Sequence, residues 1–269
     1  MILTSTFSTR ALSAHATTVT IILPESNSVP EFGWKTVTLL HGAGGNHADW
    51  TRFSSIERYA QSRGIAVIMP DGGMSFYTDC QAGDKYKTFI TEELPAFCHA
   101  HFNTSLRRED NVIGGLSMGG CGAMYLGLSC PEKYAGIICL SAANFAVEMF
   151  PKQAEHPMSP DWMSWMKNNF GQIFPELTGT EFDHYYLAKK VLEDGKPAPR
   201  IFHSTGLQEG EDGINATFKE KEFFESLEGN PFQYTFKGYP GVHNWEYWDK
   251  HIEEALDYMG FTVVPRVRF

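Results

Sequence analysis

The sequence predicts an α/β fold with a mostly parallel central sheet and helices on both faces. Three observations predict it. Several short apolar runs are continuous rather than alternating, which is typical of strands buried on both faces. Helix-like segments separate most of these runs, and this alternation favours parallel strands joined by crossovers. The chain has 269 residues, of which 42% are hydrophobic, so we expect one domain with a full-size core over residues 1–269.

The expected strands are rich in β-branched and aliphatic residues and are bounded by glycine, proline or polar residues. In chain order they are TTVTIILP (17–24), KTVTLLHG (35–42), GIAVIMPDG (64–72), NVIGGLS (111–117), YAGIICLSA (134–142), RIFHSTG (200–206) and FQYTFKGYPG (232–241). The expected helices lie between and after them, at 48–64, 86–102, 120–130, 216–228 and 244–260. Gly64 closes the first helix, and Pro95 predicts a kink in the second.

One connection is much longer than the others. Residues 145–185 are rich in Met, Trp and Phe and are interrupted by prolines. Long connections in compact domains are usually functional, so this segment is either a packed surface insertion or a cap that forms part of a binding pocket. Trp162, Trp165 and Met166 are candidates for an apolar wall of that pocket, and equally for packing between cap and core.

Composition excludes several classes of partner. The net charge of −10 argues against nucleic acid or an anionic membrane surface. No stretch of the chain reads as a signal peptide or a membrane span. The five cysteines are odd in number and lack C-x-x-C spacing, so we expect neither a metal site nor a disulfide framework. We expect a cytoplasmic protein that binds a small molecule, and we leave open whether it forms a homo-oligomer.

The segment GLSMG (115–119) has the pattern G-x-S-x-G. An apolar strand leads into it and a helix-like run follows, which is the context of a nucleophile elbow. In such an elbow the serine backbone is strained and its neighbours have no room for a Cβ atom. We therefore expect Ser117 to be a nucleophile rather than a small residue in an ordinary glycine turn.

A serine nucleophile needs a base, and topology narrows the choice among the ten histidines. In this architecture the order along the chain is serine, acid and then histidine, with the histidine after the last strand. His243 lies in such a loop, before the last expected helix. His251 is expected on a solvated helix face, His203 in the core, and His41 in a turn that it shapes.

The remaining parts of such a site are an acid and two oxyanion donors. The acid should follow strand 200–206, where the loop LQEGEDGIN offers Glu209, Glu211 and Asp212. The donors should be the amide of Met118, directly after the nucleophile, and an amide of HGAGG (41–45). In that loop we favour Ala43, with Gly44 as the alternative.

These motifs together resemble the esterase D group. The likeness rests on LLHGAGGNHADW, MPDGGMSFYTD, ITEELPAF, GGLSMGGCGA, DHYYLAKKV and YPGVHNWEYW, which cover most of the chain. The closest form is the bacterial tributyrin-esterase type, because Tyr77, Thr78 and Asp79 match its Tyr-Thr-Asp run. The resemblance implies an α/β-hydrolase fold with a small cap, no cofactor, and ester hydrolysis through an acyl-enzyme.

The acid departs from the family pattern of a glycine, two residues and an aspartate. An ungapped match places Glu209 there, whereas Asp212 matches in residue type but needs three extra loop residues. We expect Asp212 to be the acid, because a shorter side chain has fewer rotatable bonds to immobilise when its carboxylate binds the imidazole. The expected substrates are short-chain acyl esters. Alternatives are feruloyl or acetylxylan esters, S-formylglutathione, acyl transfer to an alcohol, and a non-catalytic binding protein.

Overall fold

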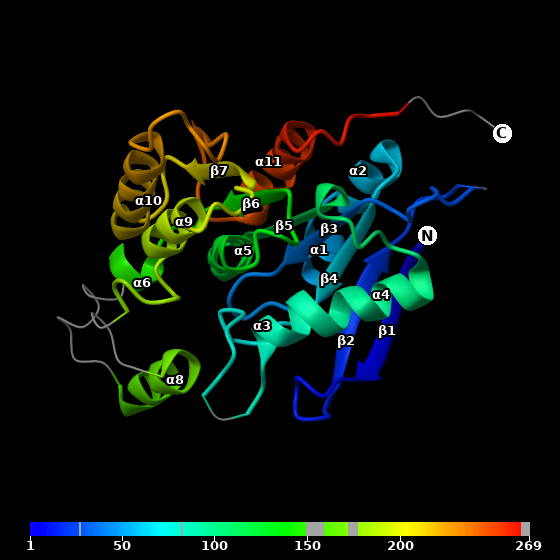
Figure 1. Ribbon diagram of the computed structural model, residues 1–269, viewed down its shortest axis with the longest axis horizontal. Helices are drawn as coiled ribbons and strands as arrows, with labels where there is room; N and C mark the ends of the chain where they lie inside the picture. Colours follow the sequence, from blue (N-terminus) through cyan, green and yellow to red (C-terminus); the bar gives the residue numbers. More distant parts are fainter. Residues whose placement is uncertain (27, 82, 149–158, 172–176, 265–269) are drawn as a thin grey trace.

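A computed structural model describes residues 1–26, 28–81, 83–148, 159–171 and 177–264. Its centre is one eight-stranded sheet with the order β1-β2-β4-β3-β5-β6-β7-β8 (Figure 1). The strands are β1 (Ile2–Ser8), β2 (Ala16–Ile22), β3 (Thr36–Leu40), β4 (Ala66–Pro70), β5 (Asn111–Leu116), β6 (Gly136–Leu140), β7 (Arg200–Gly206) and β8 (Thr235–Tyr239). From β4 to β8 every neighbouring pair is parallel, while β1–β2 and β2–β4 are antiparallel. The predicted fold class is confirmed.

Each of the seven predicted strands overlaps an observed strand, and β1 is the strand that the apolar pattern did not predict. The side chains of β3, β4 and β6 are buried along their whole length, which is why these strands appear as continuous apolar runs. β1 instead alternates between exposed and half-buried side chains at the edge of the sheet. It pairs with β2 from Ile2 opposite Ile22 to Ser8 opposite Ala16.

Two predicted helices are divided in the structure. Segment 48–64 forms α1 (Asp49–Phe53) and α2 (Ile56–Arg63), because the backbone of Ser54 is extended between them. Segment 86–102 forms α3 (Tyr86–Thr88), a π-helical turn (Phe89–Glu93) and α4 (Leu94–Phe102). The π-helical turn ends just before Pro95, whose ring nitrogen cannot donate a hydrogen bond to the preceding turn.

Helices cover both faces of the sheet (Figure 1). On one face α2 and α11 (Trp245–Tyr258) pack in a single apolar cluster with α1. On the other face α4, α5 (Met118–Ser129), α9 (His184–Glu193) and α10 (Glu211–Glu225) share a second cluster. The connections at the carboxyl ends of β3, β5, β7 and β8 meet at one edge, which is where ligands bind in open parallel sheets.

The described part of the expected cap contains α6 (Phe145–Glu148) and α8 (Pro160–Phe170). Residues 149–158 and 172–176, and the side chain of Trp162, lie outside the described structure. Met166 is fully buried in a small apolar cluster that includes Phe170 and Leu177. Trp165 donates a hydrogen bond from Nε1 to the carbonyl of Met74, 2.9 Å away. The buried members of this cluster all come from the segment 145–185, so Met166 packs within the cap segment.

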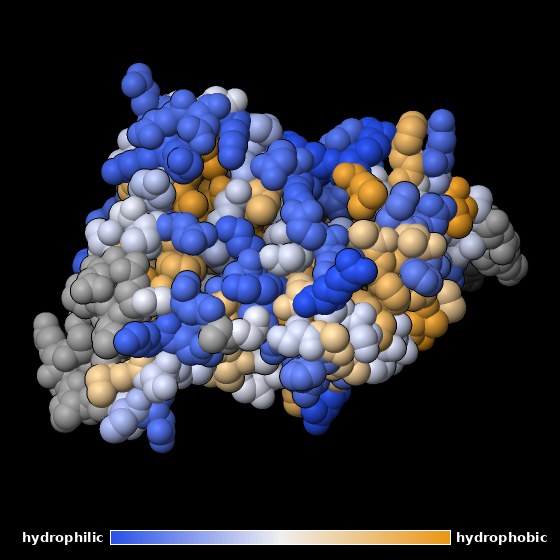
Figure 2. All heavy atoms as spheres, turned by 60° about the horizontal axis from the view of Figure 1, so that its bottom comes forward, coloured by the Kyte–Doolittle hydropathy of each residue, from blue (hydrophilic) through white to orange (hydrophobic). Residues whose placement is uncertain are grey.

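Polar and charged side chains cover much of the face shown in Figure 2, and apolar side chains gather toward the end where β1 lies in Figure 1. None of the helices in the described ranges has the length and apolar character that crossing a membrane requires.

Candidate active site

Ser117 occupies a sharp turn between β5 and α5. Its backbone has φ 52° and ψ −123°, a conformation that residues other than glycine rarely adopt. The flanking glycines make this turn feasible. A Cβ atom on Gly115 would lie 2.3 Å from the carbonyl oxygen of Gly119, and one on Gly119 would lie 2.5 Å from that of Leu40. The expected elbow geometry is therefore present, and the hydroxyl of Ser117 lies at the carboxyl edge of the sheet.

The imidazole of His243 lies between the serine and a carboxylate. Its Nε2 is 3.0 Å from Oγ of Ser117, and its Nδ1 is 2.9 Å from Oε2 of Glu209. Because a carboxylate only accepts hydrogen bonds, Nδ1 carries the proton and Nε2 is free to accept from the serine hydroxyl. The side chain of His243 is 44% exposed, so solvent and small molecules reach it.

The loops that carry Glu209 and His243 are held together by two hydrogen bonds between Gln208 and Gly241. The amide of Gln208 donates to the carbonyl of Gly241 at 2.9 Å, and the amide of Gly241 donates back to Oε1 of Gln208 at 2.5 Å. Gly206 allows this close approach, because a Cβ atom there would lie 2.5 Å from the same Gly241 carbonyl. The acid and the base therefore belong to one hydrogen-bonded unit.

The expectation of Asp212 as the acid is corrected by this geometry in favour of Glu209. α10 begins at Glu211, so Asp212 lies in its first turn and not in the loop after β7. Only four residues separate Gly206 from Glu211, and the carboxylate that they bring to His243 is that of Glu209. Asp212, which needs three extra loop residues to match the family pattern, is thus part of a helix.

Glu209 is held by three donors. Besides His243, the hydroxyl of Ser141 lies 2.5 Å from Oε1 and the amide of Gly206 lies 2.9 Å from it. Burial would raise the pKa of Glu209, but the hydrogen bonds from His243, Ser141 and Gly206 outweigh it, and the pKa lies below its usual range. The carboxylate is therefore ionised at neutral pH. Ser141 was not a candidate from the sequence, where it lies near the end of the expected strand 134–142.

The turn after β3 packs directly against the serine. A Cβ atom on Gly42 would lie 3.4 Å from Cβ of Ser117. His41, which is buried, fixes this turn: its ring Nδ1 is 2.8 Å from the carbonyl of Gly42, and its Nε2 accepts from the amide of Gly72 at 2.9 Å. The hydroxyl of Tyr77 donates to the carbonyl of His41 at 2.9 Å. His41 thus shapes the turn, as the sequence predicts.

The amides expected to bind an oxyanion lie at this junction. Within the described ranges, the amides of Ala43 and Met118 donate to no protein acceptor. The amide of Gly44 donates to Sδ of Met74 at 3.2 Å, so it is already engaged. This difference favours Ala43 over Gly44 as the donor from this turn.

His203 and His251 lie elsewhere in the fold. His203 is buried and bonded on both sides, to the hydroxyl of Tyr234 and the carbonyl of Ala142, each at 2.8 Å, which confirms its place in the core. The expectation of a solvated His251 is wrong. It is 4% exposed and stacks on Tyr239 with ring centroids 4.3 Å apart, because α11 packs this side against the sheet edge.

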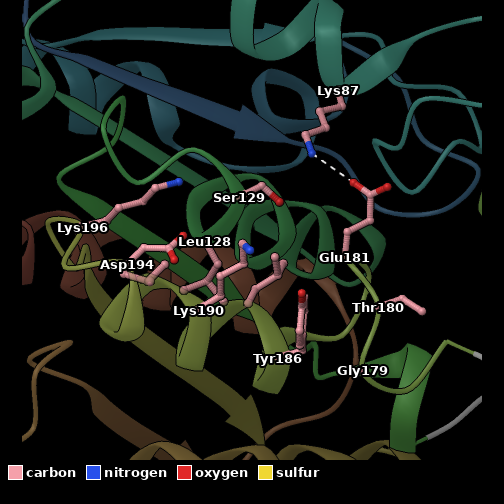
Figure 3. Close-up of a pocket in the computed structure, with 12 residues that line it drawn as sticks. Lys87, Leu128, Ser129, Gly179, Thr180, Glu181, Tyr186, Lys190, Asp194 and Lys196 are labelled. Atoms are coloured by element: carbon pink, nitrogen blue, oxygen red, sulfur yellow. Dashed lines mark hydrogen bonds and ion pairs between the residues drawn. The ribbon is translucent and has the colours of Figure 1, made fainter.

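A small aromatic cavity lies one helical turn from Ser117, beside Cys121 of α5. Its volume is about 20 Å³, and its lining includes Phe76, Phe145, Phe170 and Phe182. Trp165 and Met166 are not among its described lining residues. A larger hollow of about 240 Å³ lies at the other end of α5, beside Ser129, where Lys87 pairs with Glu181 (Figure 3). Its distance from Ser117 separates it from the candidate site.

The chain is similar in sequence to known esterases. Residues 11–259 match the family model described as "Putative esterase". An acetyl esterase of Caldicellulosiruptor saccharolyticus is 28% identical over 251 residues, covering 90% of this chain and 92% of the relative. A mycolyltransferase of Mycobacterium avium, Ag85B, is 27% identical over 224 residues, covering 72% of this chain and 64% of the relative.

Solved structures show the same fold. A fluorophosphonate-binding serine hydrolase of Staphylococcus aureus superimposes with a TM-score of 0.81 and 29% identity, covering 96% of this chain and 98% of the other. An S-formylglutathione hydrolase of the same organism gives a TM-score of 0.79 at 29% identity, with the same coverage. These matches support the α/β-hydrolase fold and carboxylic ester hydrolysis. The chain therefore belongs to the esterase family whose model it matches over most of its length.

Proposed function

We propose that the chain is a serine carboxylesterase that hydrolyses short-chain acyl esters through an acyl-enzyme intermediate. The observation that carries the proposal is the unbroken line of hydrogen bonds from Ser117 through His243 to Glu209. In that line Nε2 of His243 lies within reach of the Ser117 hydroxyl proton. The carboxylate of Glu209 accepts a hydrogen bond from Nδ1 and so holds the ring in the tautomer that the reaction needs.

In the proposed reaction Oγ of Ser117 attacks the ester carbonyl while Nε2 of His243 takes its proton. The carbonyl oxygen becomes negative and accepts hydrogen bonds from the amides of Ala43 and Met118. His243 then gives the proton to the leaving alcohol, and the acyl group remains on the serine. Water enters, His243 takes a proton from it, and the same steps in reverse release the carboxylic acid.

Two observations support short acyl groups. The aromatic cavity beside Cys121 has a volume of about 20 Å³, which suits a group of about the size of one water molecule. The relative from Caldicellulosiruptor saccharolyticus is named an acetyl esterase. We propose that the enzyme hydrolyses acetyl esters faster than butyryl esters, and that it hydrolyses tributyrin more slowly than acetyl esters.

The test is hydrolysis of p-nitrophenyl acetate by the wild type and by Ser117→Ala. We expect the variant to lose at least about 10³-fold in kcat, since the nucleophile is absent. Ser129→Ala is the matched control, because Ser129 ends the same helix and its buried hydroxyl has no partner in the described part of the chain. Wild-type turnover by Ser117→Ala would refute the proposed mechanism.

A second candidate is thioester hydrolysis of S-formylglutathione, favoured by the hydrolase of Staphylococcus aureus that bears this name. The same residues would act, and a thiolate would leave in place of an alcohol. A panel of p-nitrophenyl acetate, p-nitrophenyl butyrate, methyl ferulate, acetylated xylan and S-formylglutathione ranks the candidates by kcat/KM. The highest value on the thioester would replace the ester proposal.

Acyl transfer is a further outcome that the same experiments detect. If an added alcohol diverts the acyl group from water, the product is a new ester. Mycolyltransferases are among the relatives, so this product is sought directly by mass spectrometry.

The five cysteines are all buried and none forms a disulfide bond, which supports the expectation of a cytoplasmic protein.

A further inference from the structure

We propose that Ser141 is a positioning residue that holds Glu209 in reach of His243. The inference rests on the proposed function, because it concerns the acid of the proposed triad. Ser141 lies just after β6 and is 2% exposed, so it does not touch substrate. Its hydroxyl is 2.5 Å from Oε1 of Glu209.

The direction of this hydrogen bond is fixed by Trp248. The indole Nε1 of Trp248 is 2.9 Å from Oγ of Ser141, and an indole nitrogen only donates. Oγ of Ser141 therefore accepts from Trp248 and has its own proton to donate to Glu209. The result is a chain of donors from Trp248 through Ser141 to the carboxylate.

The two oxygens of Glu209 have separate partners. Oε2 faces Nδ1 of His243, while Oε1 accepts from Ser141 and from the amide of Gly206. A glutamate has one more rotatable bond than an aspartate, so its carboxylate needs more restraint to stay in one place. The two donors on Oε1 supply that restraint, as outer partners do for other functional side chains.

The backbone of Ser141 is itself unusual. Its φ is 50°, in the left-handed region that residues other than glycine seldom occupy. Its amide donates to the carbonyl of Ser204 at 2.7 Å, which ties this conformation to β7. Strained residues of this kind concentrate at functional sites. The ring of Trp248 also lies perpendicular to the ring of His243, with centroids 5.0 Å apart. The side chain of Trp248 therefore contacts the base and also donates a hydrogen bond to Ser141.

Ser204 offers a matched control. It is fully buried, and its hydroxyl bonds to the hydroxyl of Tyr247 at 2.6 Å. Ser204→Ala therefore removes a buried serine hydroxyl with an aromatic partner, as Ser141→Ala does, but it removes nothing from Glu209. Differences between the two variants report the effect on the acid rather than on packing.

The experiment measures kcat and KM for p-nitrophenyl acetate from pH 5 to 9 with the wild type, Ser141→Ala and Ser204→Ala. We expect Ser141→Ala to lose about 10-fold in kcat with KM changed less than 2-fold, because a positioning role affects the chemical steps and not binding. We also expect the acidic limb of its kcat/KM profile to move to lower pH. A carboxylate that is no longer held beside Nδ1 stabilises the protonated imidazole less.

A double-mutant cycle adds the decisive comparison. If Ser141 acts through the carboxylate, Ser141→Ala causes no further loss of kcat in the Glu209→Ala background, because the carboxylate is already absent. Ser141→Gly repeats the test without the backbone strain, and Trp248→Phe tests the donor chain while keeping an aromatic ring beside His243. These two variants serve if Ser141→Ala does not fold.

The outcomes separate the two proposals. Equal kcat and pH profiles for Ser141→Ala and Ser204→Ala, or full additivity with Glu209→Ala, would overturn the positioning role while the esterase proposal stands. Full activity of Ser117→Ala would overturn the esterase proposal itself.

Discussion

Replacing Glu209 tests which carboxylate serves His243. In Glu209→Gln, the side-chain amide can donate to Nδ1 of His243, which would move the imidazole proton to Nε2. That nitrogen could then no longer accept from Ser117. In other serine hydrolases the loss of the correct tautomer lowers kcat by about 10⁴-fold. This corresponds to about 5.4 kcal/mol of transition-state stabilisation at about 1.36 kcal/mol per tenfold.

Glu209→Asp gives a sharper test of the geometry. Oε2 of Glu209 lies 2.9 Å from Nδ1 of His243. Removing one methylene withdraws the carboxylate by about 1.5 Å, the length of one C–C bond. The gap then exceeds the roughly 3.2 Å limit of a good N–H···O hydrogen bond. We expect a loss of at least about 10²-fold in kcat, even though aspartate is the commoner residue in this role.

The assay is the initial rate of p-nitrophenyl acetate hydrolysis at saturating substrate, with folding checked by thermal unfolding. Asp212→Asn is the control, and we expect it to stay within about 2-fold of wild type, because Asp212 lies in the first turn of α10. A large loss in Asp212→Asn together with near wild-type rates in Glu209→Asp would refute the assignment of the acid.

The remaining predictions concern the supports of the site. Gly119→Ala places a Cβ atom 2.5 Å from the carbonyl of Leu40, so we expect a drop in melting temperature and loss of turnover. Burial lowers the pKa of His41 below 6.5, and protonated Nε2 cannot accept from Gly72. The folded state therefore binds this proton more weakly than the unfolded chain, so His41 adds stability above pH 6.5 that is lost as the pH falls toward the lowered pKa. Urea unfolding at pH 5 and 7.5 should show a smaller pH dependence in His41→Gln, by at most about 1.4 kcal/mol per pH unit. Phe170→Ala enlarges the aromatic cavity, so the kcat/KM ratio of butyrate to acetate esters should rise, with a stability cost of about 3 kcal/mol; an unchanged ratio would show that this cavity does not hold the acyl group.

Local patterns predicted most of the fold because the parallel strands are buried on both faces. Burial on both faces favours apolar residues at most positions, and such runs are visible without any tertiary information. β1 was not predicted from this pattern. It is an edge strand with one face in solvent, so its side chains alternate in exposure and several of them are polar. The break at Ser54 was also invisible, because the apolar periodicity continues across it.

For the site, the sequence by itself determined Ser117 and His243 as candidates. The elbow must have glycines two positions before and after the serine, because the backbone there leaves no room for a Cβ atom. The loop between the last strand and the helix after it contains one histidine, His243, and this loop lies at the carboxyl edge of the sheet. Both signals are local, so they can be recognised from a few consecutive residues.

Only the tertiary structure shows which carboxylate lies beside His243 and which side chains contact it. Glu209 and Asp212 lie three residues apart, and the start of α10 at Glu211 determines which carboxylate faces the imidazole. Ser141 and Trp248 are 107 positions apart in the chain, and neither has a local pattern that marks it. Their contacts arise because the carboxyl ends of separate parallel strands meet at one edge, a juxtaposition that no short stretch of sequence contains.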